Sequence, residues 1–283
     1  MPQDRGLGNL GGPGPRHAKP WGGGLALWAC AWGQDRHGLW QAFAINGVRQ
    51  VMRWIAPGEF LMGSPPEEAE RYDDERQHQV TLSQGFWLAE TPCTQELWQA
   101  VMGNNPSHFT KHLQNPVDQI SWDESQQFCQ RANALLHGLQ LRLPTEAQWE
   151  YACRAGTSTP FSFGEQITTK QANYDGNYPY TDGPKGEYRE QTVPVSEFEP
   201  NHWGLFQMHG NVWEWCQDWY GDYPSQAVID AQGSAKGTGR VLRGGSWIDF
   251  AELLRCASRN HFRPDIRFHY HLIGLRLAGG VDP

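Results

Sequence analysis

Apolar and polar positions alternate in different ways along the chain, and the first regular stretch is β-rich. Residues 25–56 hold short apolar runs separated by turn residues, and one of the turns is the pair Asn46-Gly47. An Asn-Gly pair between apolar runs is a strong signal for a two-residue hairpin. We therefore expect a small antiparallel hairpin or meander that packs on the domain C-terminal to it. The preceding residues 1–24 are rich in Gly and Pro, which predicts a disordered lead-in.

Helical spacing is confined to the middle of the chain. A short helix is predicted just after Thr94, and two further helices begin at residues 121–124 (SWDE) and 145–148 (TEAQ). In both segments a hydroxyl residue is followed three positions later by Glu or Gln, which is the capping-box pattern of a helix start. The helix that begins at 121–124 should end near residue 136, with Leu135 facing inward.

Beyond residue 154 the chain contains turns and short strands but no long helical pattern. We therefore interpret residues 57–283 as one α+β domain. Within it, residues 65–77 (PPEEAERYDDERQ) are strongly acidic. Such a charge run usually forms a solvated surface loop.

Composition favours irregular structure and argues against some partners. Apolar residues are 39% of the 283-residue chain, yet Trp numbers 14, Gly 32 and Pro 19, so aromatic side chains alternate with turn formers. The net charge of -8 and the pI near 5.7 argue against nucleic acid as a partner. No apolar run could span a bilayer, and the first residues lack the apolar core of a signal peptide. We therefore expect a cytoplasmic monomer that does not contact a membrane.

Motifs rich in Gly and Trp support a family resemblance. They are GEFLMGS at 58–64, RLPTEAQWEY at 142–151, GNVWEW at 210–215, RGGSW at 243–247 and GLR at 274–276. In this order, over residues 57–278, they resemble the formylglycine-generating enzyme (sulfatase-modifying factor) family. The resemblance implies a C-type-lectin-like fold with two main helices, many short strands and long loops. It also implies bound calcium.

The family's enzymes oxidise a cysteine of a sulfatase to formylglycine with two copper-binding cysteines that follow the Gly-Gly-Ser-aromatic turn. Here Asp249 takes the position of the first cysteine, and the second has no counterpart because the segment between Trp247 and Arg255 is short. A carboxylate cannot replace the soft thiolates that bind copper(I), so we expect no copper and no oxidase activity. A superfamily enzyme that acts without the cysteine pair is the alternative.

The C-terminal region, about residues 240–280, mixes framework motifs with side chains that follow neither helical nor strand spacing. Its frame is similar to the variable proteins of diversity-generating retroelements, in which template adenines are randomised, most often in asparagine codons. Such randomised codons never yield Lys, Glu, Gln, Met or Trp. The irregular positions all obey this restriction: Ile248, Asp249, Phe250, Ser258, His261, Phe262, Ile266, Phe268, His269, Tyr270 and His271. Glu252 does not, and we assign it to the framework.

The irregular side chains have the composition of a binding surface. Aromatic rings supply rigid contact area, and His, Asp and Ser supply adaptable polar contacts, as in antibody loops. We therefore expect a non-catalytic protein whose diversified C-terminal surface binds an unknown protein ligand. The separate β segment before residue 57 suggests another alternative, an accessory module of a signalling protein such as a kinase.

The family resemblance implies two structural calcium sites, built from carbonyl and side-chain oxygens as a hard cation requires. The matching residues are Asn173, Tyr174, Glu187 and Arg189 for the first site, and Gln207, Gly210, Val212 and Glu214 for the second. Gln207 is longer than the family's usual ligand at its position, and it is neutral.

The six cysteines are widely spaced and form no Cys-x-x-Cys pair, which argues against a zinc knuckle. Cys153 and Cys256 match positions that form a disulfide in some members of the family, so the resemblance implies a bridge. Two adjacent reduced thiols are the alternative in a reducing compartment. His261, His269 and His271 raise the question of a metal site, but random diversification accounts for them without one.

Overall fold

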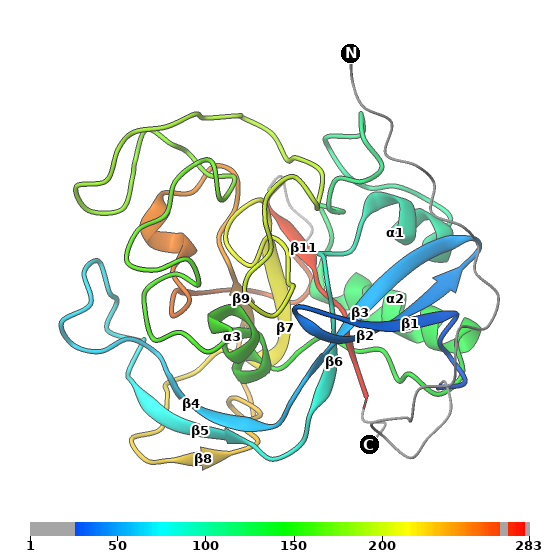
Figure 1. Ribbon diagram of the computed structural model, residues 1–283, viewed down its shortest axis with the longest axis horizontal. Helices are drawn as coiled ribbons and strands as arrows, with labels where there is room; N and C mark the ends of the chain where they lie inside the picture. Colours follow the sequence, from blue (N-terminus) through cyan, green and yellow to red (C-terminus); the bar gives the residue numbers. More distant parts are fainter. Residues whose placement is uncertain (1–25, 267–270, 281–283) are drawn as a thin grey trace.

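The computed structural model describes residues 26–266 and 271–280 (Figure 1). The predicted lead-in at residues 1–24 lies outside the described residues, as do Phe268, His269 and Tyr270. In chain order the elements are β1 Ala31–Asp35, β2 Gly38–Ile45, β3 Val48–Ile55, β4 Gly58–Met62, β5 His78–Leu82, β6 Phe86–Ala89, α1 Gln95–Met102, α2 Trp122–Leu135, α3 Glu146–Arg154, β7 Trp213–Trp219, β8 Val228–Ile229, β9 Arg240–Arg243, the 3-10 helix η1 Ala251–Leu254, β10 Arg259–Phe262, β11 Ile273–Leu275 and β12 Ala278–Gly279.

The N-terminal part forms a meander, β1-β2-β3, within a five-stranded sheet of order β1-β2-β3-β6-β12. The turn between β2 and β3 is the predicted hairpin: Asn46 and Gly47 have positive φ (50° and 86°), as a two-residue hairpin turn requires. β3 then pairs antiparallel with β6, with Ile55 opposite Phe86. A boundary at residue 57 would therefore cut through one continuous sheet.

The helices α1, α2 and α3 occur where the helical spacing predicts them. The capping boxes at residues 121–124 and 145–148 both form. Leu135 is a correction, because its side chain is 54% exposed at the end of α2. The chain becomes extended at Leu136, and it is this side chain that turns into the core. No helix of the described residues is long and apolar enough to cross a membrane.

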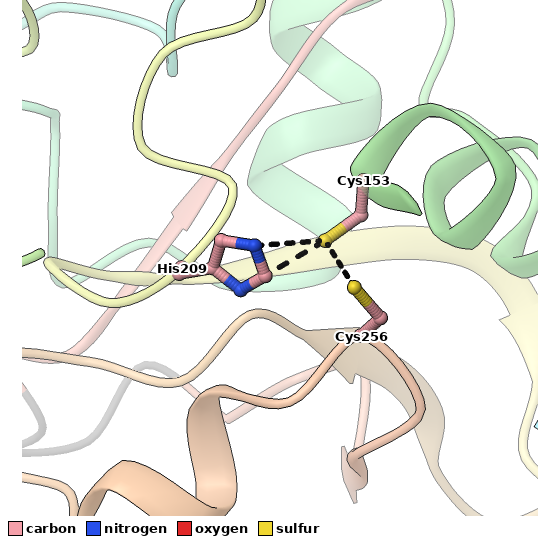
Figure 2. Close-up of side chains that lie close together, drawn as sticks. All are labelled: Cys153, His209 and Cys256. Atoms are coloured by element: carbon pink, nitrogen blue, oxygen red, sulfur yellow. Dashed lines mark hydrogen bonds between the residues drawn. The ribbon is translucent and has the colours of Figure 1, made fainter. Parts of the chain in front are cut away.

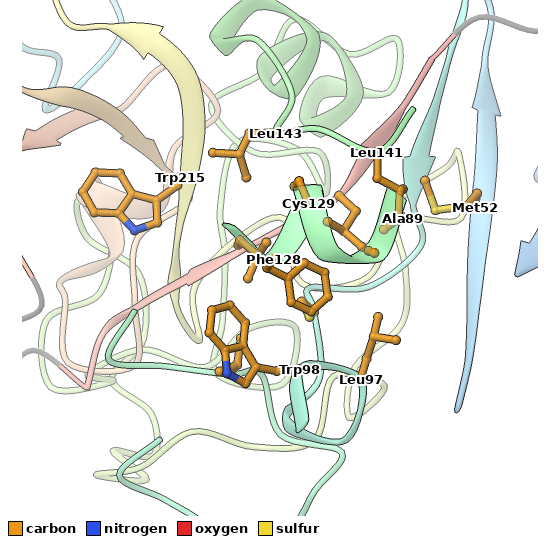
Figure 3. Packing of buried hydrophobic residues seen from close by; sticks show 14 of the residues in the cluster. Met52, Ala89, Leu97, Trp98, Phe128, Cys129, Leu141, Leu143 and Trp215 are labelled. Carbon is orange, nitrogen blue, oxygen red and sulfur yellow. The ribbon is translucent and has the colours of Figure 1, made fainter. Parts of the chain in front are cut away.

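The main hydrophobic core surrounds α2 (Figure 3). Phe128 stacks on Trp98 of α1, with ring centroids 5.2 Å apart. Met52 of β3 and Ala89 of β6 reach this core from one sheet, and Trp215 of β7 reaches it from another. Burying a large apolar side chain contributes about 1.5–3 kcal/mol. The helix therefore joins the two sheets firmly.

The second sheet, of order β10-β9-β7-β11, carries the C-terminal region, and a small third sheet has the order β4-β5-β8. The C-terminal apolar residues 273–279 divide between two sheets. β11 runs parallel to β7, whereas β12 pairs with β6. Arg276 lies between β11 and β12, and its guanidinium donates two hydrogen bonds of 2.8 Å to the carboxylate of Glu214.

Candidate binding surface

The Gly-Gly-Ser-Trp turn follows β9 directly and starts the candidate surface. Gly244 and Gly245 have positive φ (100° and 74°), and a Cβ on Gly245 would lie 2.7 Å from Leu254 Cδ1. Glycine is therefore required at both positions. Asp249 closes the turn, because its carboxylate accepts hydrogen bonds from the backbone N–H and the hydroxyl of Ser246. Burial raises the pKa of Asp249 against the opposing effect of these bonds. The Asp249 carboxylate, predicted to contact a ligand, thus serves the turn.

The other described variable positions differ in how far their side chains reach solvent. Exposed side chains are Ile248, Phe250 and His261, and partly buried ones are Phe262, Ile266 and His271. These positions form two groups. Ile248, Phe250 and His271 lie at or beside the Gly-Gly-Ser-Trp turn, whereas His261, Phe262 and Ile266 lie in β10 or in the turn after it. Phe262 packs partly against the main core, so it has a structural role as well.

Ser258 is a correction to the predicted surface. Its side chain is fully buried immediately before β10. The guanidinium of Arg243, also fully buried, donates a hydrogen bond to the Ser258 carbonyl. A side chain enclosed in this way cannot reach a ligand, so Ser258 belongs to the scaffold.

Trp247 links the turn to loops that are distant in sequence. Its ring lies edge-on to Phe109, with centroids 5.5 Å apart, and is stacked near Tyr188 at 6.1 Å. The indole N–H donates to the carbonyl of His271 at 2.7 Å. Trp247 is itself buried, so it supports the surface from below.

Two ring pairs lie beside this support. Tyr178, which is 51% exposed, packs on Phe250 at a centroid distance of 4.0 Å. His108, also exposed, stacks on His271 at 3.6 Å. The sequence pattern predicts neither Tyr178 nor His108 as a contact residue, because isolated rings in loops carry no spacing signal. We define the candidate binding surface as Ile248, Phe250 and His271 together with Tyr178 and His108.

The arginine directly after η1, Arg255, is buried together with two carboxylates. It donates to both oxygens of Glu75 and to Glu68, each at 2.7 Å. Both glutamates belong to residues 65–77, which the charge pattern predicts as a solvated loop. That prediction is wrong for these two side chains, which are at most 3% exposed. Pairing with Arg255 draws them inward, because a buried charge must be paired.

Two further arginines tie the second sheet to α3. Arg259 of β10 donates to both oxygens of Glu146, at 2.7 and 3.0 Å, and Arg243 of β9 pairs with Glu150 one turn further along the helix. Burial alone would raise the pKa of Glu146, but the guanidiniums of Arg259 and Arg243 outweigh burial and hold that pKa below its usual value. The scaffold under the variable side chains is thus held by buried ion pairs.

The sequence profile of the sulfatase-modifying factor enzyme 1-like domain matches residues 44–280. The chain belongs to the sulfatase-modifying factor family. It is 32% identical to the formylglycine-generating enzyme of Mus musculus over 199 residues, which cover 66% of this chain and 50% of that enzyme. It is 31% identical to the serine/threonine-protein kinase pkn1 of Chlamydia caviae over 261 residues, which cover 81% of this chain and 38% of the kinase. The chain thus spans half or less of the length of these relatives.

Solved structures share the fold. Treponema denticola variable protein 1 has a TM-score of 0.71 at 29% identity, covering 84% of this chain and 98% of that one. PvdO from Pseudomonas aeruginosa has a TM-score of 0.69 at 24% identity, covering 89% of this chain and 99% of that one, and it shows the fold alone. The predicted α+β fold of the formylglycine-generating enzyme type is confirmed, and so is the resemblance to a variable protein.

The residues that match the family's second calcium site are already satisfied within the protein. Both carboxylate oxygens of Glu214 accept hydrogen bonds from Arg276, and one also accepts from the indole of Trp149 at 2.7 Å. Gln207 uses its amide N–H and its carbonyl in hydrogen bonds to neighbours, and the Gly210 carbonyl accepts from the backbone N–H two residues later. This set does not fit a calcium ion.

The first calcium site fits better. Asn173 Oδ1 is buried and accepts no hydrogen bond from the described residues, while its Nδ2 donates to Asn211 and to the Gln191 carbonyl. An unpaired buried oxygen is a group that a hard cation would satisfy. Glu187, in contrast, is 63% exposed and pairs with Arg189 at 3.0 Å, so its carboxylate would have to turn inward to join Asn173.

Cys153 and Cys256 lie side by side as free thiols, with their Sγ atoms 3.6 Å apart (Figure 2). The proximity that the family resemblance implies is present. The ring of His209 lies beside Cys153, with Nε2 3.7 Å from Sγ. His209 is not singled out by sequence reasoning, because no spacing relates it to either cysteine.

Proposed function

We propose that this chain is a non-catalytic ligand-binding protein whose C-terminal surface has been diversified and recognises a protein partner. The proposal is carried by the contrast within one segment. Ile248 and Phe250 are exposed, and Phe250 packs on Tyr178, while Arg243 and Arg255 of the same segment are buried in ion pairs. A rigid base that presents exposed aromatic side chains is the arrangement expected of a recognition surface. The family match and the likeness to Treponema denticola variable protein 1 support it.

The chemistry of the site argues against the family's oxidase reaction. Asp249 stands where the first copper-binding cysteine would be, and its carboxylate is held by Ser246. The thiols that do lie together, Cys153 and Cys256, are fully buried, so a polypeptide substrate cannot reach them. Copper-dependent oxidation of a substrate cysteine needs accessible thiolates that bind copper(I), and the described residues offer none at this turn.

The partner is proposed to be a protein because the surface is aromatic and only lightly charged. Exposed aromatic rings with polar neighbours are typical of the centre of protein interfaces. The net charge of -8 argues against nucleic acid. We also propose that the chain acts as a monomer, so that this surface is open to its ligand.

Calcium is retained in the proposal only at the first site. If it binds there, Asn173 Oδ1 would ligate it together with carbonyls of the same loops, and the ion would stabilise them without taking part in chemistry. The expected result is that calcium added to metal-free protein raises the melting temperature, and that Asn173→Ala abolishes the rise. An equal rise in Asn173→Ala would place calcium elsewhere.

Two experiments test the proposed function. Sequencing of the surrounding DNA should reveal a reverse-transcriptase gene and a near-copy of the last coding segment with adenines at the variable positions. The absence of both would contradict diversification.

Incubating the reduced protein with copper, oxygen and a sulfatase-derived cysteine peptide should leave the peptide's mass unchanged, whereas conversion to formylglycine would establish the enzyme alternative.

A second candidate is an accessory domain of a signalling protein. It is favoured by the match to the Chlamydia caviae kinase, which reaches over 81% of this chain. In that case an antibody against the domain should detect a native polypeptide much larger than 32.1 kDa. A native polypeptide of 32.1 kDa would contradict it.

A further inference from the structure

Three side chains of metal-ligating types meet in the interior, and none of them belongs to the candidate binding surface (Figure 2). Cys153 lies near the end of α3, His209 in the loop before β7, and Cys256 just after η1. Their ligand atoms all lie within 4.8 Å of one another, and each residue is at most 2% exposed. We propose that Cys153, Cys256 and His209 form a structural zinc site.

Two of the three distances between ligand atoms are close to those that a tetrahedral zinc ion requires. Zn–S bonds of about 2.3 Å and Zn–N bonds of about 2.0 Å place two ligating sulfurs about 3.8 Å apart and sulfur and nitrogen about 3.5 Å apart. The two Sγ atoms are 3.6 Å apart, and Cys153 Sγ is 3.7 Å from His209 Nε2. The third distance, from Cys256 Sγ to the His209 nitrogen, is within 4.8 Å. Cys153 Sγ is also 4.0 Å from Nδ1, so it lies beside the ring, and side-chain rotations would have to bring the three ligands onto one ion.

His209 is oriented in the manner of a zinc ligand. Its Nδ1 lies 2.7 Å from the carbonyl of Leu254, which fixes the tautomer with the proton on Nδ1 and leaves the Nε2 lone pair for a metal. Burial lowers the pKa of His209 to about 4, so the ring is neutral at physiological pH. The Nε2 lone pair now faces Ser162, whose backbone N–H and hydroxyl lie at 3.2 and 2.9 Å. Zinc would replace these two bonds at Nε2, and the Ser162 side chain would have to move aside for the ion.

Charge selects a divalent ion. Burial raises the pKa of the Cys153 thiol well above its usual value, so this thiol carries its proton when no metal is bound. Zinc binding would release one proton from each thiol, and the two thiolates would neutralise the two charges of the ion. A net charge of zero is the least costly state for a site sealed from water. A monovalent ion would leave a buried negative charge, and a disulfide between the same sulfurs would exclude the metal.

The site would reinforce the base of the candidate binding surface. The carbonyl that orients His209 belongs to Leu254, the last residue of η1, and η1 begins next to Phe250. Zinc would thus join α3, the loop before β7 and the segment that presents Phe250. Its role is structural and does not depend on which ligand the surface binds.

The test uses the full chain, purified with a non-thiol reductant and stripped of metal, with Co²⁺ as an optical probe for zinc. We expect one Co²⁺ per chain, with thiolate-to-cobalt charge-transfer bands and the visible bands of a tetrahedral ion, all lost on adding Zn²⁺. Zinc at about 100-fold above its dissociation constant should raise the melting temperature by about 5–10 °C. His209→Val should weaken zinc binding by at least about 100-fold, and Cys153→Ala should abolish the thiolate bands.

Cys216→Ala is the matched control, because Cys216 is an equally buried free thiol outside the cluster. This variant should bind cobalt as the unmodified chain does. The proposal is overturned if the reduced chain shows no thiolate-to-cobalt bands. It is overturned equally if His209→Val binds zinc with unchanged affinity, or if mass spectrometry finds Cys153 and Cys256 joined by a disulfide in the reduced preparation.

Discussion

The two faces of the segment from Arg243 to Phe262 carry opposite kinds of side chain. On the inner face, Arg243 and Arg255 are fully buried, and each is paired with a buried carboxylate. On the outer face, Ile248 and Phe250 are about two-fifths exposed (41% and 40%). Removing one partner of a buried ion pair on the inner face should lower the stability of the protein considerably. Replacing an exposed side chain on the outer face should lower it little. One short stretch of chain can therefore hold the fold while its outward side chains vary.

The largest expected effect comes from breaking the inner face. Arg255→Met leaves Glu68 and Glu75 buried without a cation and should lower the free energy of unfolding by about 3–5 kcal/mol. Urea unfolding monitored by Trp fluorescence measures the change. Arg263→Met is the matched control, because Arg263 pairs with Asp265 at 2.8 Å in solvent and should cost at most about 1 kcal/mol. Equal losses in the two variants would contradict the distinction between the faces.

Ser258 is a second test of the comparison. Its place in the sequence pattern predicts an outer-face residue, but its side chain is buried like those of the inner face. Ser258→Phe should destabilise the chain by about 1–3 kcal/mol through overpacking. His261→Phe, at an exposed position three residues later, should leave stability nearly unchanged. Thermal melts of the two variants decide the matter, and a neutral Ser258→Phe would return Ser258 to the variable surface.

The stability of the fold should also depend on pH through Asp218 of β7, whose carboxylate accepts a hydrogen bond from the backbone N–H of Glu146, the partner of Arg259. Burial, and then the negative charge of Glu146, raise the pKa of Asp218 to about 7. The folded state therefore holds a proton that the unfolded chain has released above its usual pKa of 3.8, so stability falls as pH rises from about 4 to about 7. The slope approaches about 1.4 kcal/mol per pH unit. Asp218→Asn should make the slope less steep in urea titrations at several pH values, and an unchanged slope would exclude a contribution from Asp218.

The smallest effect is expected on the outer face. Ile248→Ala and Phe250→Ala should each change the free energy of unfolding by no more than about 0.5 kcal/mol, because neither side chain fills the core. Calorimetry of the single and double variants measures this. A loss above about 2 kcal/mol for either would mean that the residue is part of the scaffold.

Local features of the fold could be predicted from the sequence. The Asn46-Gly47 turn and the two capping boxes depend only on neighbouring residues, and all three form. The family motifs gave the remaining architecture through resemblance. Features that depend on partners distant in sequence could not be predicted. Glu68 and Glu75 are typical of a solvated loop until Arg255, 180 residues after Glu75, is placed beside them.

The candidate binding surface could likewise be predicted only in part. Irregular spacing and codon restriction marked Ile248 and Phe250, which are exposed, but they also marked Ser258, which is buried. Neither signal contains information about which way a side chain points. Tyr178 and His108 join the surface from separate loops, so only the folded chain brings them together.

A pair of displayed libraries tests the central claim most directly. One library randomises Ile248, Phe250, His261 and Ile266, and the matched one randomises four buried positions of the same region, Arg243, Arg255, Ser258 and Arg276. The measurement is the fraction of members that remain folded by protease resistance. We predict that most members of the first library fold and few of the second do. Survival of the two libraries at the same frequency would contradict a variable surface on a fixed scaffold.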